Sequence, residues 1–236
     1  MELSKRLKEI TFLIDKCNVI ADIGTDHGYV PIYSVKKGLC SKAIASDINK
    51  GPVDKARMNV KREGLDKVIS CRQGPGLSTL KVNEAETAII AGMGGNLIRD
   101  IILDEFNVVK ELKTLILQPA QNPEVLRKFL YNSSFSVLRE TVIYDEGKFY
   151  EIFKVSYNET NNIKYKQYID YELSDILIKS GSPHVKPYLE FKLSSYERIL
   201  NYIGEDSETA LVRRQEVNNK VILLKELIDW RLSLKQ

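Results

Sequence analysis

Short apolar runs alternate with segments of helical periodicity over residues 1–132 of this 236-residue chain. Each run has the length of a buried strand, and glycine or proline follows most of them closely. Strands are expected at Cys17–Ile23, Lys42–Asp47, Lys67–Cys71, Thr87–Ala91 and Lys113–Leu117. Helices are expected at Leu3–Asp15, Pro31–Lys37, Pro52–Glu63, Ile98–Phe106 and Pro123–Asn132. Because helical crossovers join parallel strands, the alternation predicts a parallel sheet with helices on both faces.

Two further strand-like segments follow without a helix between them. Ser134–Tyr144 and Lys148–Ser156 are rich in valine, isoleucine, phenylalanine and tyrosine, and Asp145-Glu146-Gly147 supplies a turn. We therefore expect an antiparallel hairpin at the end of the sheet. The predicted fold class is α/β, a doubly wound, Rossmann-like sheet with a C-terminal antiparallel hairpin.

A polar stretch, Asn158–Asn162, has the composition of a linker. It separates an expected sheet domain at residues 1–158 from a helical appendage at residues 163–236. Apolar residues recur there at spacings of three and four, which predicts three helices of a small coiled-coil-like domain. The apolar stripes are Ile169/Leu173/Ile176, Leu189/Leu193/Tyr196/Leu200/Ile203 and Val217/Val221/Leu224/Ile228.

Composition excludes several classes of protein. The longest run without a charged residue, Thr87–Ile98, is well short of the roughly 20 residues that a membrane-spanning helix needs. Cys17, Cys40 and Cys71 form neither a disulfide framework nor a zinc pattern, and the N-terminal segment lacks the apolar region of a signal peptide. We expect a cytoplasmic protein without a membrane or metal partner, and a monomer. The net charge of +3 is too small to indicate a nucleic-acid partner by itself.

The segment Asp22–Gly28 joins the first strand to the next helix, where open α/β sheets bind ligands. Its glycines, Gly24 and Gly28, permit a tight turn and close approach of a ligand. Their spacing departs from the Gly-x-Gly-x-x-Gly fingerprint of dinucleotide sites. A carboxylate at Asp22 suits a cationic or hydroxyl-bearing ligand. A glycine-rich turn without a ligand is the alternative.

Asp47 ends the second strand, about twenty residues beyond the glycine-rich turn. An acid in that position can accept hydrogen bonds from both hydroxyls of a ribose. The alternative is an acid that stabilises the start of the following helix through the helix dipole. The neighbouring glycine-rich turn favours the ribose.

The later loops carry further signals. Gln73–Leu77 could hold an adenine edge, although an ordinary turn explains the same residues. Ala91–Asn96 contains three glycines, which favours close approach of a ligand, and a sharp strand-to-helix turn is the alternative. Asn122 before Pro123 is expected to cap a helix, and the role of Gln118 stays open.

Charged side chains give weaker signals. His27 lies beside Asp26 in the first loop and is a plausible ligand contact, whereas His184 is expected at the surface. No catalytic triad or phosphate-binding loop is discernible. Basic residues cluster at Lys5/Arg6/Lys8, Lys36/Lys37, Arg57/Lys61/Arg62 and Arg127/Lys128. If they share a surface, they could follow a phosphate backbone, and solvated helix faces are the alternative.

The chain resembles the TrmK family of bacterial tRNA (adenine-N1)-methyltransferases, which modify position 22. The resemblance rests on four segments taken together: Ala21–Tyr29, Ala45-Ser46-Asp47, Gly92-Met93-Gly94-Gly95 and Gln118-Pro119. The resemblance implies a class I methyltransferase domain, S-adenosyl-L-methionine as cofactor and tRNA as partner. The residues that it places at the cofactor are Asp22, Gly24, Asp26, His27, Gly28, Asp47, Ile48, Gly74, Gly92, Met93 and Gly94. This chain has Gly74-Pro75-Gly76 where the family pattern leads us to expect Gly-Asp-Gly.

The implied reaction needs no strong base, because adenine N1 carries a lone pair at neutral pH. Positive charge develops on the base, so a nearby carboxylate would stabilise it. Asp26 is the expected catalytic residue, with help from the carbonyl groups of Gly92–Gly95. The appendage is expected to bind tRNA. A methyltransferase acting on another RNA or a small molecule, a nicotinamide oxidoreductase and a non-catalytic RNA-binding protein are the alternatives.

Overall fold

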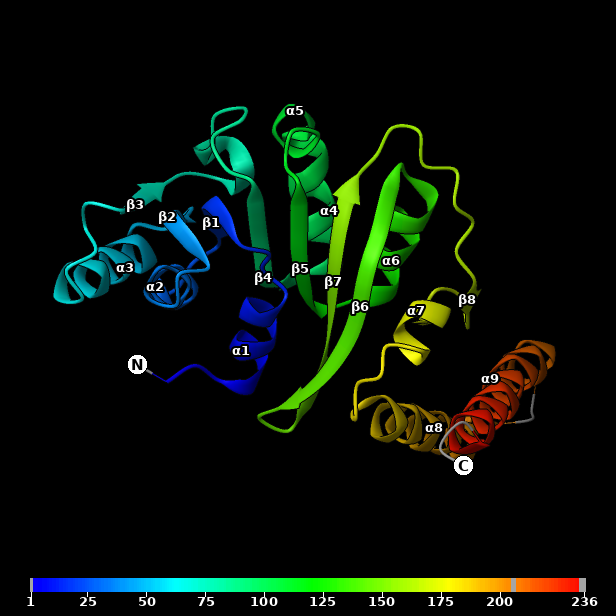
Figure 1. Ribbon diagram of the computed structural model, residues 1–236. Coiled ribbons are helices and arrows are strands. Elements are labelled where there is room, and N and C mark those ends of the chain that lie inside the picture. Colours follow the sequence, from blue (N-terminus) through cyan, green and yellow to red (C-terminus); the bar gives the residue numbers. More distant parts are fainter. Residues whose placement is uncertain (1, 205–206, 234–236) are drawn as a thin grey trace. The chain divides into compact units, whose positions relative to one another are not determined.

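The computed structural model describes residues 2–204 and 207–233. The chain divides into two compact units, Met1–Ser174 and Asp175–Gln236. A seven-stranded sheet in the order β3-β2-β1-β4-β5-β7-β6 forms the centre of the first unit (Figure 1). Its strands are β1 (Cys17–Ile23), β2 (Cys40–Asp47), β3 (Ile69–Gln73), β4 (Thr87–Gly94), β5 (Thr114–Gln121), β6 (Phe135–Asp145) and β7 (Lys148–Tyr157).

Helices cover both faces of this sheet, as the alternation predicted. In Figure 1, α1 lies in front of the strands and α4 and α6 lie behind them. The helices of the unit are α1 (Lys5–Phe12), α2 (Tyr29–Lys36), α3 (Lys50–Arg62), the 3₁₀ turn η1 (Gly76–Thr79), α4 (Gly95–Asp104), α5 (Phe106–Val109) and α6 (Pro123–Asn132). The central strands are apolar on both faces because both are covered, and Ile20, Ile89 and Ile116 are fully buried.

The hairpin is where the sequence placed it, and the predicted fold class is confirmed. Strands β1 to β5 pair in parallel, whereas β7 pairs antiparallel with both β5 and β6. The antiparallel strand therefore lies one position inside the edge, and the outermost strand, β6, again runs parallel to β5.

The boundary between the units differs from the expected linker at Asn158–Asn162. Residues 163–174 belong to the first unit, because polar side chains attach them to β6 and α6. The Tyr165 hydroxyl accepts a hydrogen bond from the Val137 amide at 2.8 Å, and Asn161 donates to the Phe135 carbonyl at 2.6 Å. The first of the three expected appendage helices is also wrong. Its residues form the short strands β8 (Gln167–Tyr168) and β9 (Leu173–Ser174) and the start of α7 (Asp175–Ile178).

The turn between β8 and β9 has an unusual backbone. Ile169, Asp170 and Tyr171 have φ angles of 52°, 48° and 69°, in the left-handed region that costs non-glycine residues free energy. Such a turn persists only where its surroundings hold it in place.

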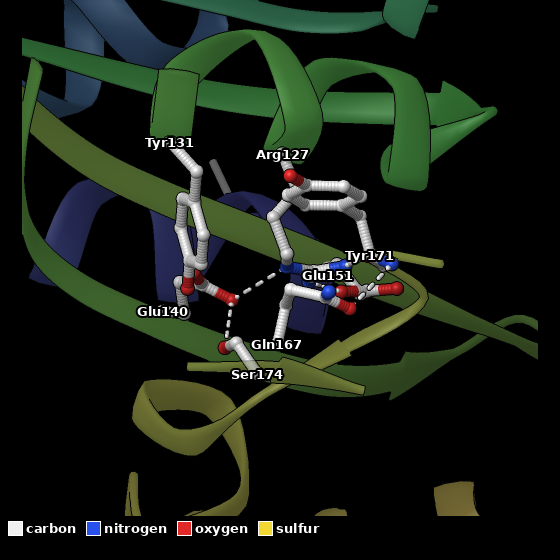
Figure 2. A network of polar contacts seen from close by, with 7 residues as sticks. All are labelled: Arg127, Tyr131, Glu140, Glu151, Gln167, Tyr171 and Ser174. Atoms are coloured by element: carbon white, nitrogen blue, oxygen red, sulfur yellow. Dashed lines mark hydrogen bonds and ion pairs between the residues drawn. The ribbon is translucent and has the colours of Figure 1, made fainter. Parts of the chain in front are cut away.

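A buried arginine holds this turn, as Figure 2 shows. Arg127 of α6 is fully buried and donates to the carbonyl of Tyr171 and to the carboxylates of Glu140 and Glu151. Glu140 also accepts a hydrogen bond from Ser174 at 2.7 Å. Burial alone lowers the pKa of the Arg127 guanidinium, but the two carboxylates outweigh burial and hold that pKa above its ordinary value.

The second unit consists of α7, α8 (Val185–Tyr202) and α9 (Glu208–Ser233). The long helices pack against each other through apolar residues that include Leu189, Val217 and Leu224, all fully buried, as their spacing predicted. Arg214 of α9 donates to the carbonyl groups of Leu200 and Ile203 at the end of α8. Within the described parts of the chain, no helix is long and apolar enough to cross a membrane.

Replacing Arg127 with methionine should lower the free energy of unfolding by about 3–5 kcal/mol, because Glu140 and Glu151 would stay buried without a cation. Urea unfolding followed by circular dichroism measures the change. The control is Arg62→Met, the same substitution at an exposed position of α3, which should change stability by about 0.5 kcal/mol or less. Equal losses in the two variants would contradict the role of the Arg127 network.

Candidate functional site

The loops that follow β1 and β2 are fastened together at the carboxyl ends of these strands. Asp22 and Ile23 lie beside Ala45 and Ser46 in the parallel register. Beyond the last pair, the amides of Gly24 and Thr25 both donate to the Ser46 carbonyl at 2.8 Å. The first loop is thereby held against the end of β2.

Glycine is favoured at position 24, where the first loop passes the end of β4. Its φ of +78° favours glycine, and a Cβ there would lie 2.2 Å from the Met93 methyl carbon. Gly28 has a φ of +70° at the N-cap of α2, where a Cβ would lie 3.3 Å from that of Ala56. The two glycines therefore have different roles, one beside the site and one in the packing of α2 on α3.

The first cavity has a volume of about 280 Å³ and lies beyond the ends of β1, β2 and β4. It brings together five of the residues expected at a cofactor: Gly24, Asp47, Ile48, Gly74 and Met93. Much of its remaining wall is apolar, formed by Leu77, Leu97 and Ile101. Ile48 and Leu97 are 61% and 52% exposed, high values for large apolar side chains. A flat apolar ring attached to a hydroxyl-bearing group suits such a wall.

Asp47 lies both at the start of α3 and at the first cavity, so either of its expected roles is compatible with its position. One carboxylate oxygen accepts a hydrogen bond from the Asn49 amide at 2.7 Å, just before α3. The carboxylate also lines the first cavity. Since a carboxylate has two oxygens with four lone pairs, fixing the loop leaves acceptor capacity for a ligand.

A second cavity of about 440 Å³ adjoins the first at Gly24, which lines both. We call it the acidic cavity, because four carboxylates line it: Asp22, Asp26, Asp145 and Glu146. The residues that complete its wall are Ser4, Arg6, Leu7, Gly24, Thr25, His27, Tyr29, Val30, Ala91, Gly92 and Tyr150. Such a cavity favours a ligand that carries or develops positive charge.

Asp26 lies at the mouth of the acidic cavity. Its side chain is 69% exposed, and one oxygen is 3.0 Å from Nε2 of His27. The His27 ring stacks on Tyr29, with 5.0 Å between the ring centroids and 10° between the planes. The carboxylate is thus oriented by an imidazole, and the imidazole by a second aromatic ring.

Asp22 lies deep in the same cavity and is 8% exposed. Burial raises the pKa of its carboxyl group from 3.8 to about 6, opposed by a hydrogen bond from Thr25 and by the charge of Arg6. A raised pKa marks a carboxylate that gains from a cationic partner.

Other predicted residues lie elsewhere. Gly28 and Gly94 line neither cavity, and Gly94 is instead the N-cap of α4. Asn122 occupies the expected N-cap of α6, but its side chain makes no capping hydrogen bond. Arg127, one of the expected surface cations, is the buried residue of Figure 2.

Sequence reasoning missed the contribution of Arg6, Asp145, Glu146 and Tyr150 to the acidic cavity. They come from α1 and from the β6–β7 hairpin, far from the glycine-rich loops in sequence. No group of three histidine, cysteine, aspartate or glutamate residues in the described ranges is placed to hold a metal ion.

Comparisons with known proteins agree with this geometry. Residues 3–153 match the Methyltransferase domain family. The chain is 32% identical to the tRNA (adenine(22)-N(1))-methyltransferase of Bacillus subtilis over 97% of its length and 98% of the relative's. It is similar to the crystal structure of B. subtilis TrmK, with a TM-score of 0.82, 32% identity and coverage of 96% and 99% of the two chains. It is also similar to a Streptococcus pneumoniae protein crystallised with S-adenosyl-L-methionine, with a TM-score of 0.83 and 29% identity. The match covers 96% of this chain and 100% of that protein.

Replacing Asp22 with asparagine should stabilise the protein increasingly as the pH rises from about 4 to 6. Below this range the carboxyl is protonated in both folded and unfolded chains, and above it the buried group is charged at a cost. A pKa raised from 3.8 to about 6 corresponds to about 3 kcal/mol. Urea unfolding of both proteins at several pH values measures the difference, and a difference independent of pH would contradict the raised pKa.

Proposed function

The chain belongs to the TrmK family of bacterial tRNA (adenine(22)-N(1))-methyltransferases, and from this premise we propose that it transfers a methyl group from S-adenosyl-L-methionine to N1 of adenine 22 in tRNA. The observation that carries the proposal is the pair of cavities that meet at Gly24. The first cavity has suitable residues for an adenosyl group. The acidic cavity has the negative charge to stabilise a cation that forms during the reaction.

The residues of the first cavity fit the adenosyl part of the cofactor. Asp47 would accept hydrogen bonds from the ribose hydroxyls, and Ile48 and Leu77 would cover the faces or edges of the adenine. The absence of a side chain at Gly24 allows the cofactor to pass from the first cavity to the second. When bound, the cofactor supplies a methyl group activated by a positively charged sulfur.

Methyl transfer places demands mainly on position and charge. Adenine N1 attacks the methyl carbon with its own lone pair, so the N–C bond forms as the S–C bond breaks, and no proton must be removed first. Positive charge then lies on the adenine ring. The carboxylates of the acidic cavity would stabilise that charge, and Asp26, oriented by His27, lies where an entering base would meet it.

The same carboxylates repel phosphate, so the RNA backbone must be bound outside the acidic cavity. Arg57, Lys61 and Arg62 are exposed on α3, and Lys37 is exposed after α2. These side chains and the second unit, with its exposed basic residues on α8 and α9, are the surfaces that we propose for the tRNA body. Their contacts would offset the few kcal/mol needed to expose adenine N1 from stacking or pairing.

The direct test incubates the protein with S-adenosyl-L-methionine carrying a labelled methyl group and with unmodified tRNA, and then maps the methylated nucleotide. We expect label at N1 of adenine 22 and none in a tRNA with guanine at that position. Label in a small molecule or at another nucleotide would show that the acceptor differs, and absence of any transfer would refute the proposal.

A chain that ends at Ser174 tests the role of the second unit, through its affinities for the cofactor and for tRNA. We expect its affinity for the cofactor to match that of the full chain, because both cavities lie in the first unit. Its affinity for tRNA should fall by roughly tenfold or more, the loss expected from a few phosphate contacts. Equal tRNA affinity would show that the second unit does not bind tRNA.

Replacing Asp26 with asparagine should lower kcat by roughly 10- to 100-fold, the range for losing one stabilising carboxylate near a developing charge. Cofactor affinity, measured by calorimetry, should stay within about twofold, since Asp26 does not line the first cavity. Asp66→Asn, an exposed acid outside both cavities, is the control. Unchanged kcat in Asp26→Asn would refute the electrostatic role.

A further inference from the structure

Helix α3 contacts the first loop at two positions. A Cβ on Gly28 would lie 3.3 Å from the Cβ of Ala56, and the side-chain amide of Asn59 donates to the His27 carbonyl at 2.9 Å. Ala56 and Asn59 are three residues apart and therefore share a face of the helix. Ala56 is fully buried and Asn59 half-buried, and neither residue lines the first cavity or the acidic cavity. The first loop thus has a support that lies outside both cavities.

The helix that carries Asn59 is itself fixed to the sheet. Val53, Ala56 and Val60 are buried, and α3 packs against β2 and β3. The start of α3 is held by the hydrogen bond between the Asn49 amide and the carboxylate at the end of β2. Because α3 is held along its length, the amide of Asn59 offers the first loop a fixed donor.

The hydrogen bond from Asn59 acts on the part of the first loop that is otherwise least fastened. Before Asp26 and His27, two loop amides bind the end of β2, as described above; after them, the Gly28 amide donates to Oγ1 of Thr25 at 3.2 Å. Among the residues that the structure describes, the bond to Asn59 is the only hydrogen bond that joins the main chain of Asp26 or His27 to another element. Its loss would free these two residues together.

The restrained residue orients the expected catalytic carboxylate. Nε2 of His27 lies 3.0 Å from a carboxylate oxygen of Asp26, and the His27 ring stacks on Tyr29. Fixing the His27 carbonyl fixes the plane of the adjoining peptide, and with it the backbone from which the imidazole projects. Stabilisation of a developing charge depends on groups that are oriented before the reaction, and a displacement of about 1 Å can lower a rate by about 100-fold. A hydrogen bond outside the cavities can therefore affect catalysis through the position of Asp26.

We propose that Asn59 is a positioning residue for methyl transfer, which holds the Asp26–His27 pair in place through the His27 carbonyl. The proposal rests on the proposed function and on the role of Asp26 given there. The alternative is a purely structural role, in which the hydrogen bond stabilises the fold without affecting the pair. The two roles differ in one respect, because positioning ceases to matter once the Asp26 carboxylate has been removed.

Replacing Asn59 with leucine removes the amide at a similar side-chain volume. We expect kcat to fall by roughly tenfold, because the Asp26–His27 pair loses its fixed position. The KM for tRNA and the cofactor affinity, measured by calorimetry, should stay within about twofold, since the pair serves the chemical step. Asn59→Gln keeps the amide on a longer side chain and should recover part of the loss. Asn59→Ala makes the same deletion should the leucine variant fail to fold.

A double-mutant cycle separates positioning from a structural role. In the Asp26→Asn background, Asn59→Leu should lower kcat by no more than about twofold, because the carboxylate that the hydrogen bond positions is already absent. The same fold-loss of kcat in both backgrounds would overturn the proposal, since Asn59 would then act independently of Asp26.

Asn132→Leu is the matched control. Asn132 is exposed on α6, lines neither cavity and, like Asn59, donates its amide to a main-chain carbonyl, that of Lys128 at 2.7 Å. This variant should keep the wild-type kcat. Unchanged kcat in Asn59→Leu, or a loss of cofactor affinity as large as the loss of kcat, would overturn the proposal. Full kcat in Asp26→Asn alone would refute the proposed role of Asp26 and with it the positioning role, a result distinct from equal losses in the two backgrounds.

Discussion

Two backbone hydrogen bonds, from Gly24 and Thr25 to the Ser46 carbonyl, fix the first loop, and Gly24 of this loop lines both cavities of the site. They extend the pairing of β1 and β2 one step beyond the strands, so the first loop cannot move away from the end of the sheet. The φ of +78° at position 24 favours glycine, and the end of the Met93 side chain, from β4, occupies the space beside it. The two cavities are the spaces on either side of this crossing, and their different chemistry follows from which loops reach each side.

The sheet could be predicted from the sequence because its signals are local. Cys17–Ile23 is a continuous apolar run closed by glycine, and β1 has these bounds in the structure. Pro123–Asn132 likewise forms α6 as expected, since proline at its first position marks the start. Residues 163–174 were misjudged because Ile169 and Leu173 have helical spacing, whereas their conformation is decided by Arg127, more than forty residues earlier in the chain.

Only part of the candidate site could be predicted from the sequence in the same way. Asp22, Gly24, Asp47 and Met93 lie at the carboxyl ends of strands or just beyond them, and the geometry of parallel sheets places these ends together. Arg6 carries no such signal, because a basic residue on an amphipathic helix has the same pattern whether it faces solvent or a cavity. Its position depends on α1 packing against β6 and α2, a contact between the beginning of the chain and its middle.

The left-handed turn at Ile169–Tyr171 has a consequence for recombining relatives of this protein. The polar stretch at residues 158–162 looks like the natural place to join the first unit of one homologue to the helices of another. A junction there would separate Tyr171 and Ser174 from the arginine and glutamate that they contact, and would pair a strained turn with a foreign surface. Chimeras should therefore exchange sequence after Ser174, so that donor and recipient each keep this turn with its own binding partners.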